Sequence, residues 1–277
     1  LFNKILEFKE SNNNVGIIGC KMIDGQGKFL PESKRNLPNL SMVLNKFLGL
    51  KNNYHLNILP DDEIGQADVL CGAIMLMNKK EFEDVGGFDE KYFMFGEDID
   101  LSYKMKKKGL SNYYLGNLSI IHYKGESTIK NMKYYRDFYG AMGIYYRKFI
   151  ANNIFSKFFS YFLIELIVFA HLFKFKSKSN FIDNTKDSYI VSNKDYFSLK
   201  SRGTKRIQSI ESISNKIENC EIIFDSNYIT FNDIISSIQT LSNNKNLIFK
   251  ILSKGSNFII GSNNSNEQGE VILFDSN

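Results

Sequence analysis

The stretch from Val85 to Leu101, which reads VGGFDEKYFMFGEDIDL, constrains the fold of this chain more than any other segment. The pair Gly86-Gly87 predicts the end of a short helix, because glycine adopts the left-handed conformation of a helix C-cap at little cost. A second helix is expected to begin near Asp98, with acidic residues in its first turn and lysines in its last, which complements the helix dipole. The stretch therefore predicts two helices joined by an acidic, aromatic loop.

The loop and the second helix start bring several carboxylates together with aromatic side chains. The carboxylates belong to Asp89, Glu90, Glu97, Asp98 and Asp100. Burial beside aromatic rings raises the pKa of a carboxyl group, which suits a general base, whereas the dipole at a helix start favours the anion. Helix capping alone leaves the aromatic surroundings unexplained, so we favour a functional site over a cap.

The segment GGFDEKYFMFGEDIDLSYKMKKKG resembles the acceptor-side signature of family 2 glycosyltransferases, notably their rhamnosyltransferase-like branch. The resemblance implies an α/β fold that contains part of a GT-A (nucleotide-diphospho-sugar transferase) domain. It implies that Asp98 is the catalytic base and that Glu97 and Asp89 position the base or the acceptor. Glu90, in the same GGFDE element, is expected to contribute to substrate binding.

The resemblance also implies an activity. Such an enzyme transfers a sugar, with inversion, from a UDP- or dTDP-sugar to a saccharide or lipid-linked saccharide acceptor in cell-surface polysaccharide biosynthesis. Two other classes of function stay open, namely a catalytically inactive transferase-like partner in a membrane assembly and a nucleotide- or sugar-binding module. The intact GEDID segment argues against the inactive partner.

Residues 67–78, ADVLCGAIMLMN, predict an apolar strand that is interrupted by Cys71, Gly72 and Ala73. Glycine inside a strand marks a bulge or a close approach of the backbone to a ligand. The resemblance implies that these three residues lie beside the active site and contact substrate. A bulge in a core strand is the equally weighted alternative.

Strands are predicted at residues 112–115 and 118–122, and His122 ends the second one. The resemblance implies that this histidine completes a divalent-metal site, with Mg²⁺ or Mn²⁺ as the ion; imidazole suits Mn²⁺ better. A purely structural histidine is the alternative. Ser127 and Thr128 then match a Ser-Thr pair that is expected to contact phosphate or acceptor.

The main metal ligands are expected upstream of this chain. In the resembled family a strand like Val15–Cys20 follows the donor-binding half, which carries a DxD-type motif. Asp98-Ile99-Asp100 has that spelling but lies in the acceptor-side element. We therefore expect the chain to begin just beyond the donor site and to be inactive alone.

Residues 31–65 contain all three prolines and predict a long surface loop with a helix near residues 41–50. Lys34 and Arg35 lie in this loop. A contact with a diphosphate is conceivable for them, but we interpret them as solvated surface charge.

Two consecutive helices are predicted over residues 133–148 and 154–175. The first is rich in tyrosine with interleaved basic residues, which fits a membrane interface or an aromatic core helix. The second is the most apolar run, but Glu165 near its centre argues against a span of about 20 uncharged residues. We expect this amphipathic helix to lie on an anionic membrane surface.

The C-terminal part predicts strands at residues 188–192, 220–224, 247–252 and 271–274, with a helix at 230–241 that Thr230 caps. Strand, helix and strand at these lengths form a β-α-β unit and hence a parallel sheet. The tail resembles an incomplete Rossmann-like domain. The expected organisation is thus 1–148 as the acceptor-side half of the transferase domain, 149–178 as a membrane-associated linker and 179–277 as the Rossmann-like domain.

Composition limits the partners. A net charge of +5 over 277 residues permits contact with anionic lipid but does not indicate nucleic-acid binding. Cys20, Cys71 and Cys220 are widely spaced and odd in number, so they predict neither a zinc site nor a disulfide framework. We expect a cytoplasmic protein, peripheral at the inner face of the cell membrane.

Overall fold

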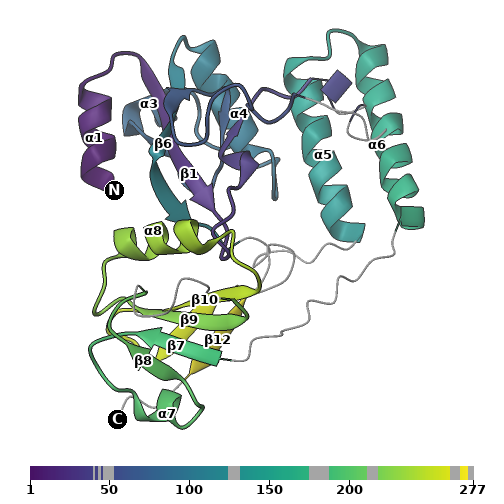
Figure 1. Cartoon of the computed structure of the whole chain (residues 1–277). Helices are drawn as coiled ribbons and strands as arrows, with labels where there is room; N and C mark the ends of the chain where they lie inside the picture. Colours follow the sequence, from purple (N-terminus) through teal and green to yellow (C-terminus); the bar gives the residue numbers. More distant parts are fainter. Residues whose placement is uncertain are drawn as a thin grey trace. The chain divides into compact units, whose positions relative to one another are not determined.

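The structure is a computed structural model that describes residues 1–39, 41–42, 45, 53–123, 132–174, 187–210, 218–262 and 269–273. It is a mixed α/β protein with two compact units (Figure 1). The first comprises Leu1–Lys21, Leu30–Leu118 and Lys130–Ser177. The second comprises Met22–Phe29, Ser119–Ile129 and Lys178–Asn277. The helix predicted near residues 41–50 lies mostly outside the described residues.

A four-stranded sheet anchors the first unit, in the order β3 (Ile64–Gln66), β6 (Ser111–Ile121), β1 (Val15–Ile23) and β5 (Leu76–Met77). Every residue of β1 is buried, as its continuous apolar run predicts. Helix α1 (Phe2–Glu10) contributes Ile5 to a core with Ile18 and Leu115.

Two strand predictions were wrong. Residues 67–78 form two short strands, β4 (Val69–Leu70) and β5, in different sheets, because the Cys71–Ala73 segment turns the chain between them. Residues 112–122 form one strand rather than two. A Cβ on Gly116 would lie 2.5 Å from the Glu63 carbonyl oxygen, so this glycine allows a close crossing instead of ending the strand.

The acidic loop is framed by the two predicted helices, α3 (Lys79–Asp84) and α4 (Glu97–Lys107). Gly86 and Gly87 both have positive φ after α3, as the cap prediction requires. Gly96, with φ of +81°, precedes α4 and turns the chain sharply into its acidic first turn. Short strand β2 (Lys34–Arg35) follows a 3₁₀ turn, η1 (Pro31–Ser33), and pairs antiparallel with β4.

Helices α5 (Met132–Phe149) and α6 (Ile154–Lys174) lie side by side (Figure 1). Tyr139 of α5 packs on Ile167 and Val168 of α6. Where the structure describes the chain, no helix has the length and apolar character needed to cross a membrane.

Gly143 sets how closely α5 and α6 approach. A Cβ there would lie 2.1 Å from Cδ1 of Ile164, whereas a Cβ on Gly140 of the same helix meets no atom within 4 Å. We expect Gly143→Ala to destabilise the chain by about 1–3 kcal/mol through overpacking. Gly140→Ala should stabilise it by about 0.5–1 kcal/mol through helix propensity. Urea denaturation checks both, and equal effects would contradict the close helix contact.

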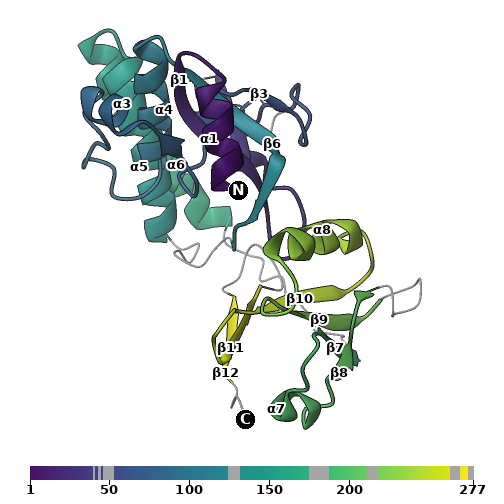
Figure 2. The same ribbon diagram turned by 90° about the vertical axis from the view of Figure 1, so that its left-hand side faces the viewer.

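The second unit is built on a six-stranded sheet (Figure 2). Its strand order is β12 (Glu270–Leu273), β11 (Phe258–Gly261), β10 (Leu247–Leu252), β9 (Cys220–Asp225), β7 (Asp187–Val191) and β8 (Lys205–Ile207). The run from β8 to β10 is parallel, and β11 and β12 are antiparallel additions. The predicted β-α-β unit is confirmed as β9, α8 (Phe231–Leu241) and β10, and the Thr230 side chain caps α8 by accepting the Asp233 amide.

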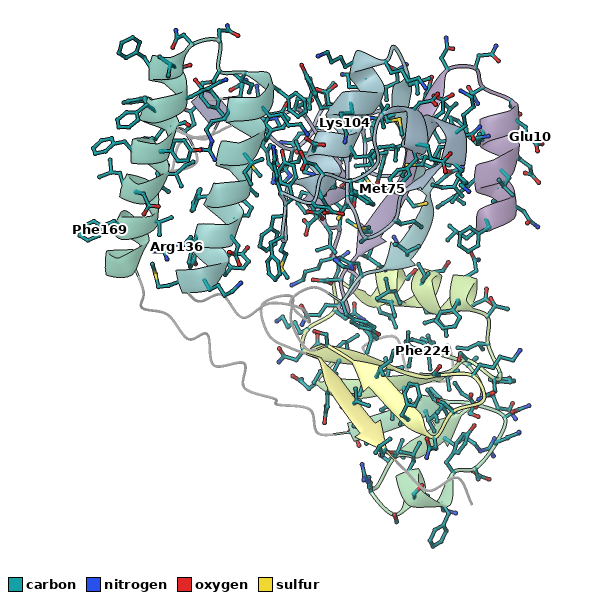
Figure 3. All side chains as sticks on the ribbon, turned by 180° about the vertical axis from the view of Figure 1, so that it is seen from behind. Glu10, Met75, Lys104, Arg136, Phe169 and Phe224 are labelled. Atoms are coloured by element: carbon teal, nitrogen blue, oxygen red, sulfur yellow. The ribbon has the colours of Figure 1, made fainter. Side chains whose placement is uncertain are left out.

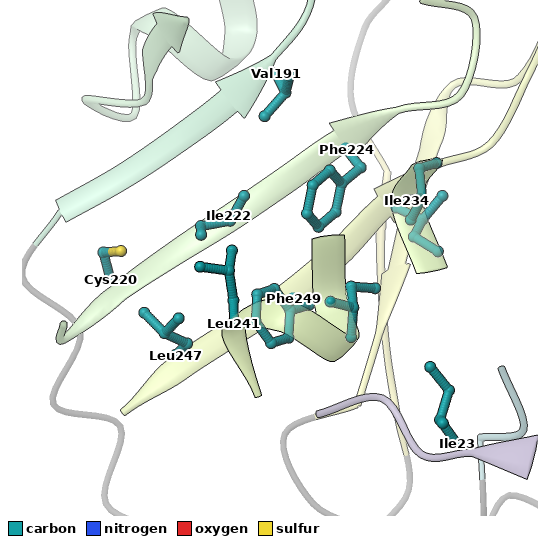
Figure 4. Close-up of a cluster of buried hydrophobic side chains, with 11 residues drawn as sticks. Ile23, Val191, Cys220, Ile222, Phe224, Ile234, Leu241, Leu247 and Phe249 are labelled. Atoms are coloured by element: carbon teal, nitrogen blue, oxygen red, sulfur yellow. The ribbon is translucent and has the colours of Figure 1, made fainter. Parts of the chain in front are cut away.

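Side chains of α8 cover one face of this sheet. Ile234 and Leu241 pack against Phe224 and Phe249 from the two central strands (Figure 4). Strands β8 and β11 and the short helix α7 (Phe197–Lys200) were not predicted. Strand β8 has only three residues, two of them exposed, so it carries no apolar pattern to detect.

Candidate active site

Asp98 stands in the first turn of α4 and is only 8% exposed. Its Oδ2 accepts a hydrogen bond from Arg35 Nη2 at 2.6 Å and from the Gly72 amide at 3.2 Å. Its Oδ1 accepts from the Ile99 amide at 2.8 Å. Charge-assisted and backbone hydrogen bonds of this kind fix the orientation of a buried carboxylate.

Arg35 and Lys34 are buried, so their interpretation as solvated surface charge was wrong. The pairing of β2 with β4 carries both side chains inside, where Arg35 is 7% exposed. Burial is the largest single effect and lowers the pKa of Arg35. The charge of Asp98 and the hydrogen bond to it, together with Tyr54 and Cys71, outweigh burial, so the net pKa is raised. Lys34 forms an ion pair with Asp61 at 2.8 Å. No signal in the sequence separates this basic pair from surface charge, because the burial comes from a two-residue strand.

Glu97 differs from Asp98 in its surroundings. Its Oε2 is buried and has no hydrogen-bond partner among the described residues. Burial, followed by the charge of Asp98, raises the pKa of Glu97 above its usual range, although Arg35 opposes the shift. A raised pKa and an available oxygen are properties of a group that exchanges protons.

The turn at Cys71, Gly72 and Ala73 lies against both carboxylates. A Cβ built on Gly72 would lie 3.5 Å from Oε1 of Glu97 and 3.5 Å from Cβ of Asp98. Burial raises the pKa of the Cys71 thiol, although Arg35 opposes this, so the thiol stays protonated near neutral pH. The structure thus brings the predicted turn together with the predicted Glu-Asp pair.

Asp100 and Asp89 belong to an ionic network that joins α4 to α5. Asp100 is fully buried and accepts from Lys148 Nζ at 2.6 Å, and Lys104 Nζ lies 3.0 Å from its other oxygen (Lys104 is labelled in Figure 3). Lys148 also donates to Asp89 Oδ2 at 2.7 Å. Asp89 therefore contacts α5 rather than the Glu97–Asp98 pair, and Glu90 beside it is exposed.

The other predicted ligands belong to the second unit or lie outside the described residues. His122 directly follows β6 and belongs to the second unit, whereas Glu97 and Asp98 belong to the first. Ser127 and Thr128 lie outside the described residues. Within the described ranges no group of three or more His, Cys, Asp or Glu is placed to hold a metal ion. A divalent ion in this enzyme would therefore need further ligands from outside the described residues.

Comparisons with known proteins define the class to which this site belongs. The family described as the N-terminal domain of galactosyltransferase matches residues 62–139, which include the turn, the acidic loop and α4. Together with the relatives below, this match supports a family 2 glycosyltransferase of the rhamnosyltransferase-like kind, as the sequence predicts.

The relatives are rhamnosyltransferases. The chain is 33% identical over 122 residues to rhamnosyltransferase WbbL of Escherichia coli K12, which covers 43% of this chain and 45% of that protein. It is 41% identical over 59 residues to N-acetylglucosaminyl-diphospho-decaprenol L-rhamnosyltransferase from two strains of Mycobacterium tuberculosis, covering 21% of this chain and 19% of the relative. The chain thus spans less than half the length of these curated relatives. No solved structure matches it.

Proposed function

We propose that this chain supplies the acceptor side of an inverting glycosyltransferase. The enzyme moves a sugar from a nucleotide-sugar donor, a UDP- or dTDP-sugar, to a saccharide or lipid-linked saccharide in cell-surface polysaccharide biosynthesis. The observation that carries the proposal is the pair of half-buried Glu97 and buried Asp98 beside Gly72, inside the segment that matches glycosyltransferases. The names of the relatives, both rhamnosyltransferases, support the same class of reaction.

Asp98 is the base in this proposal. The acceptor hydroxyl oxygen attacks the anomeric carbon, the bond from that carbon to the nucleotide diphosphate breaks, and Asp98 takes the hydroxyl proton. Oδ1 of Asp98 accepts from the Ile99 amide, and a carboxylate oxygen has a second lone pair for a substrate hydroxyl. Glu97 positions the acceptor through its unpartnered Oε2, and the Cys71–Ala73 turn forms the wall of the acceptor subsite.

A divalent metal, Mg²⁺ or Mn²⁺, belongs to this proposal with its main ligands on the donor side. When bound it offsets the charge of the leaving diphosphate. His122 is the residue of this chain that we propose as a contributor, because imidazole is a common ligand for such ions.

The membrane surface is the third element of the proposal. Helix α6 packs on α5 with one side, and its other side exposes Phe155 (82%), Phe158 (75%) and Phe162 (63%). Phe169 continues this face toward the end of the helix (Figure 3). Exposed apolar faces of this kind are typical of helices that lie in the headgroup region. This face supports our proposal that the enzyme is peripheral at the inner face of the membrane.

The proposed membrane contact predicts that vesicle binding is lost when the exposed phenylalanines of α6 are replaced. Phe158→Ser with Phe162→Ser should reduce partition onto anionic vesicles at least tenfold, because each buried phenylalanine contributes roughly 1.5–3 kcal/mol. Sedimentation with vesicles of phosphatidylglycerol and phosphatidylcholine measures this. Phe197→Ser, which alters an exposed phenylalanine of α7, is the matched control and should bind as the parent chain does. Equal binding by all three proteins would show that the α6 face does not meet lipid.

The activity itself is tested in a protein that carries the complete transferase domain. Membrane-extracted lipid-linked saccharide is incubated with labelled UDP- and dTDP-sugars, and label transfer to the lipid fraction is counted. Transfer that depends on Asp98 supports the proposal. If no donor transfers label to the lipid fraction although the protein binds the membrane normally, the result would favour the alternative of a catalytically inactive partner in a membrane assembly.

A further inference from the structure

Arg35 is the one partner of Asp98 that carries a full positive charge in the described site, and its guanidinium is fixed in place. Nη2 donates to the Leu70 carbonyl at 2.9 Å as well as to Asp98, and Nη1 donates to the Tyr54 hydroxyl at 3.0 Å. These three hydrogen bonds, one of them to a charged acceptor, hold the guanidinium in one orientation. The β2–β4 ladder, with Arg35 opposite Val69, holds the backbone from which the side chain extends.

A buried carboxylate needs a compensating charge to be ionised before it accepts a proton. Asp98 sits beside Glu97, another carboxylate, and the two repel each other when both are ionised. Arg35 is positioned to offset this repulsion at Asp98. Oδ2 of Asp98 accepts from both Arg35 and the Gly72 amide, whereas Oδ1 accepts only from the Ile99 amide, which leaves one lone pair of Oδ1 for substrate.

We propose that Arg35 is a positioning residue for the transfer reaction. It binds Oδ2 of Asp98 and directs Oδ1 toward the acceptor hydroxyl. This inference rests on the proposed function, in which Asp98 is the base. Arg35 acts through Asp98 and takes no proton itself.

The Nε of Arg35 supports a role in a site rather than in the core. It is buried and has no hydrogen-bond partner among the described residues, as is also the case for Oε2 of Glu97. An unpaired buried donor costs free energy, and native cores rarely keep one. An unpaired donor and an unpaired acceptor beside one aspartate are typical of a binding site for polar substrate groups.

Kinetics of two substitutions test the positioning role in a protein with the complete transferase domain. Arg35→Gln should lower kcat about 10- to 100-fold and leave the acceptor KM within about threefold, because substrate binding is retained. The acidic limb of the pH profile should move to higher pH, because the carboxylates of the site lose their neighbouring cation. Arg35→Lys should restore the position of the limb but only part of kcat, because an ammonium lacks the planar fork.

Other titratable side chains lie near Arg35 and Asp98. They are Tyr54 and His55 beside β2, Cys71 after β4, Glu97 on α4 and Glu32 in η1. Burial raises the pKa of Tyr54 and of Cys71, so neither ionises on the acidic limb. The limb shift is therefore measured again in Glu97→Gln, Glu32→Gln and His55→Gln backgrounds, where it should persist. Lys106→Gln, which removes a cation from the same helix α4 outside the site, is the control that should leave the limb unmoved.

Two outcomes overturn the inference without touching the proposed function. One is an Arg35→Gln enzyme with parental kcat and pH profile while Asp98→Asn is inactive. The other is an equal loss of kcat in Arg35→Gln and Arg35→Lys with no movement of the acidic limb of the pH profile. That result would mean that Arg35 has only a structural role. If Arg35→Gln alone fails to fold, Arg35→Gln with Asp98→Asn should recover folding, because the uncompensated charge is gone; failure to recover would also overturn it. An active Asp98→Asn enzyme would instead reject the proposed function.

Discussion

Asp98→Asn lowers turnover by about two to four orders of magnitude in the complete enzyme, because an amide cannot accept the proton that the acceptor hydroxyl must lose. The amide oxygen still accepts from Arg35 and the Gly72 amide, so folding should be preserved. Initial rates of sugar transfer at saturating donor measure the loss, and circular dichroism checks the fold. Turnover within threefold of the parent would remove Asp98 from the role of base.

Glu97→Gln is the informative comparison. We expect a smaller loss of turnover, because in the proposal Glu97 positions the acceptor. The structure also gives Glu97 properties of a base, since its pKa is raised by burial and its Oε2 is unpartnered among the described residues. If Glu97→Gln proved the more damaging change, the roles of the two carboxylates would be exchanged. Asp84→Asn, on an exposed carboxylate of α3, should retain full activity.

The raised pKa of Glu97 has a consequence for stability with a definite sign. A carboxyl whose pKa is higher in the folded than in the unfolded state stabilises the fold at pH below its ordinary value, about 4.3, and this contribution is lost as pH rises. The free energy of unfolding of the parent chain should therefore fall as pH rises above that value, and in Glu97→Gln this part of the fall should be absent. The effect arises from the desolvation that makes the group suitable for proton exchange.

Local chemistry made the helices and the Glu-Asp pair predictable. Gly86 and Gly87 end α3, and the order of acids and lysines marks both ends of α4, because these signals act within one or two helical turns. The β-α-β unit of the second half was predictable for the same reason, since alternating periods and the Thr230 cap are local.

The parts that depend on tertiary pairing were not predictable. Arg35 becomes a partner of Asp98 only because β2 pairs with β4, a ladder of two residues on each strand. Gly116 looked like the end of a strand, and only the nearby Glu63 backbone shows why a glycine is needed inside it. The ionic contact of Asp89 with Lys148 joins residues 59 positions apart. Sequence reasoning therefore predicted a substrate contact for Asp89 and missed its ion pair with α5.

Lys148→Met should be the most destabilising of the substitutions considered for this chain. Lys148 donates to fully buried Asp100 and to Asp89, and it thereby ties the end of α5 to the first turn of α4. Breaking a buried ion pair costs about 3–5 kcal/mol, and the low end is expected because Lys104 stays beside Asp100. Lys133→Met, on the same helix with an exposed partner in Asp137, should cost less than about 1 kcal/mol.

The pH dependence of this pair of variants identifies the cause. The hydrogen bond from Lys148 lowers the pKa of Asp89, so the contact stabilises the fold above the ordinary pKa of an aspartate and is lost as pH falls. The difference in free energy of unfolding between the parent chain and Lys148→Met should thus shrink as pH falls from about 5 to about 2. Urea denaturation at several pH values measures it. A constant difference would mean that the Lys148 methylene packing, rather than its charge, supports the first turn of α4 and with it Asp98.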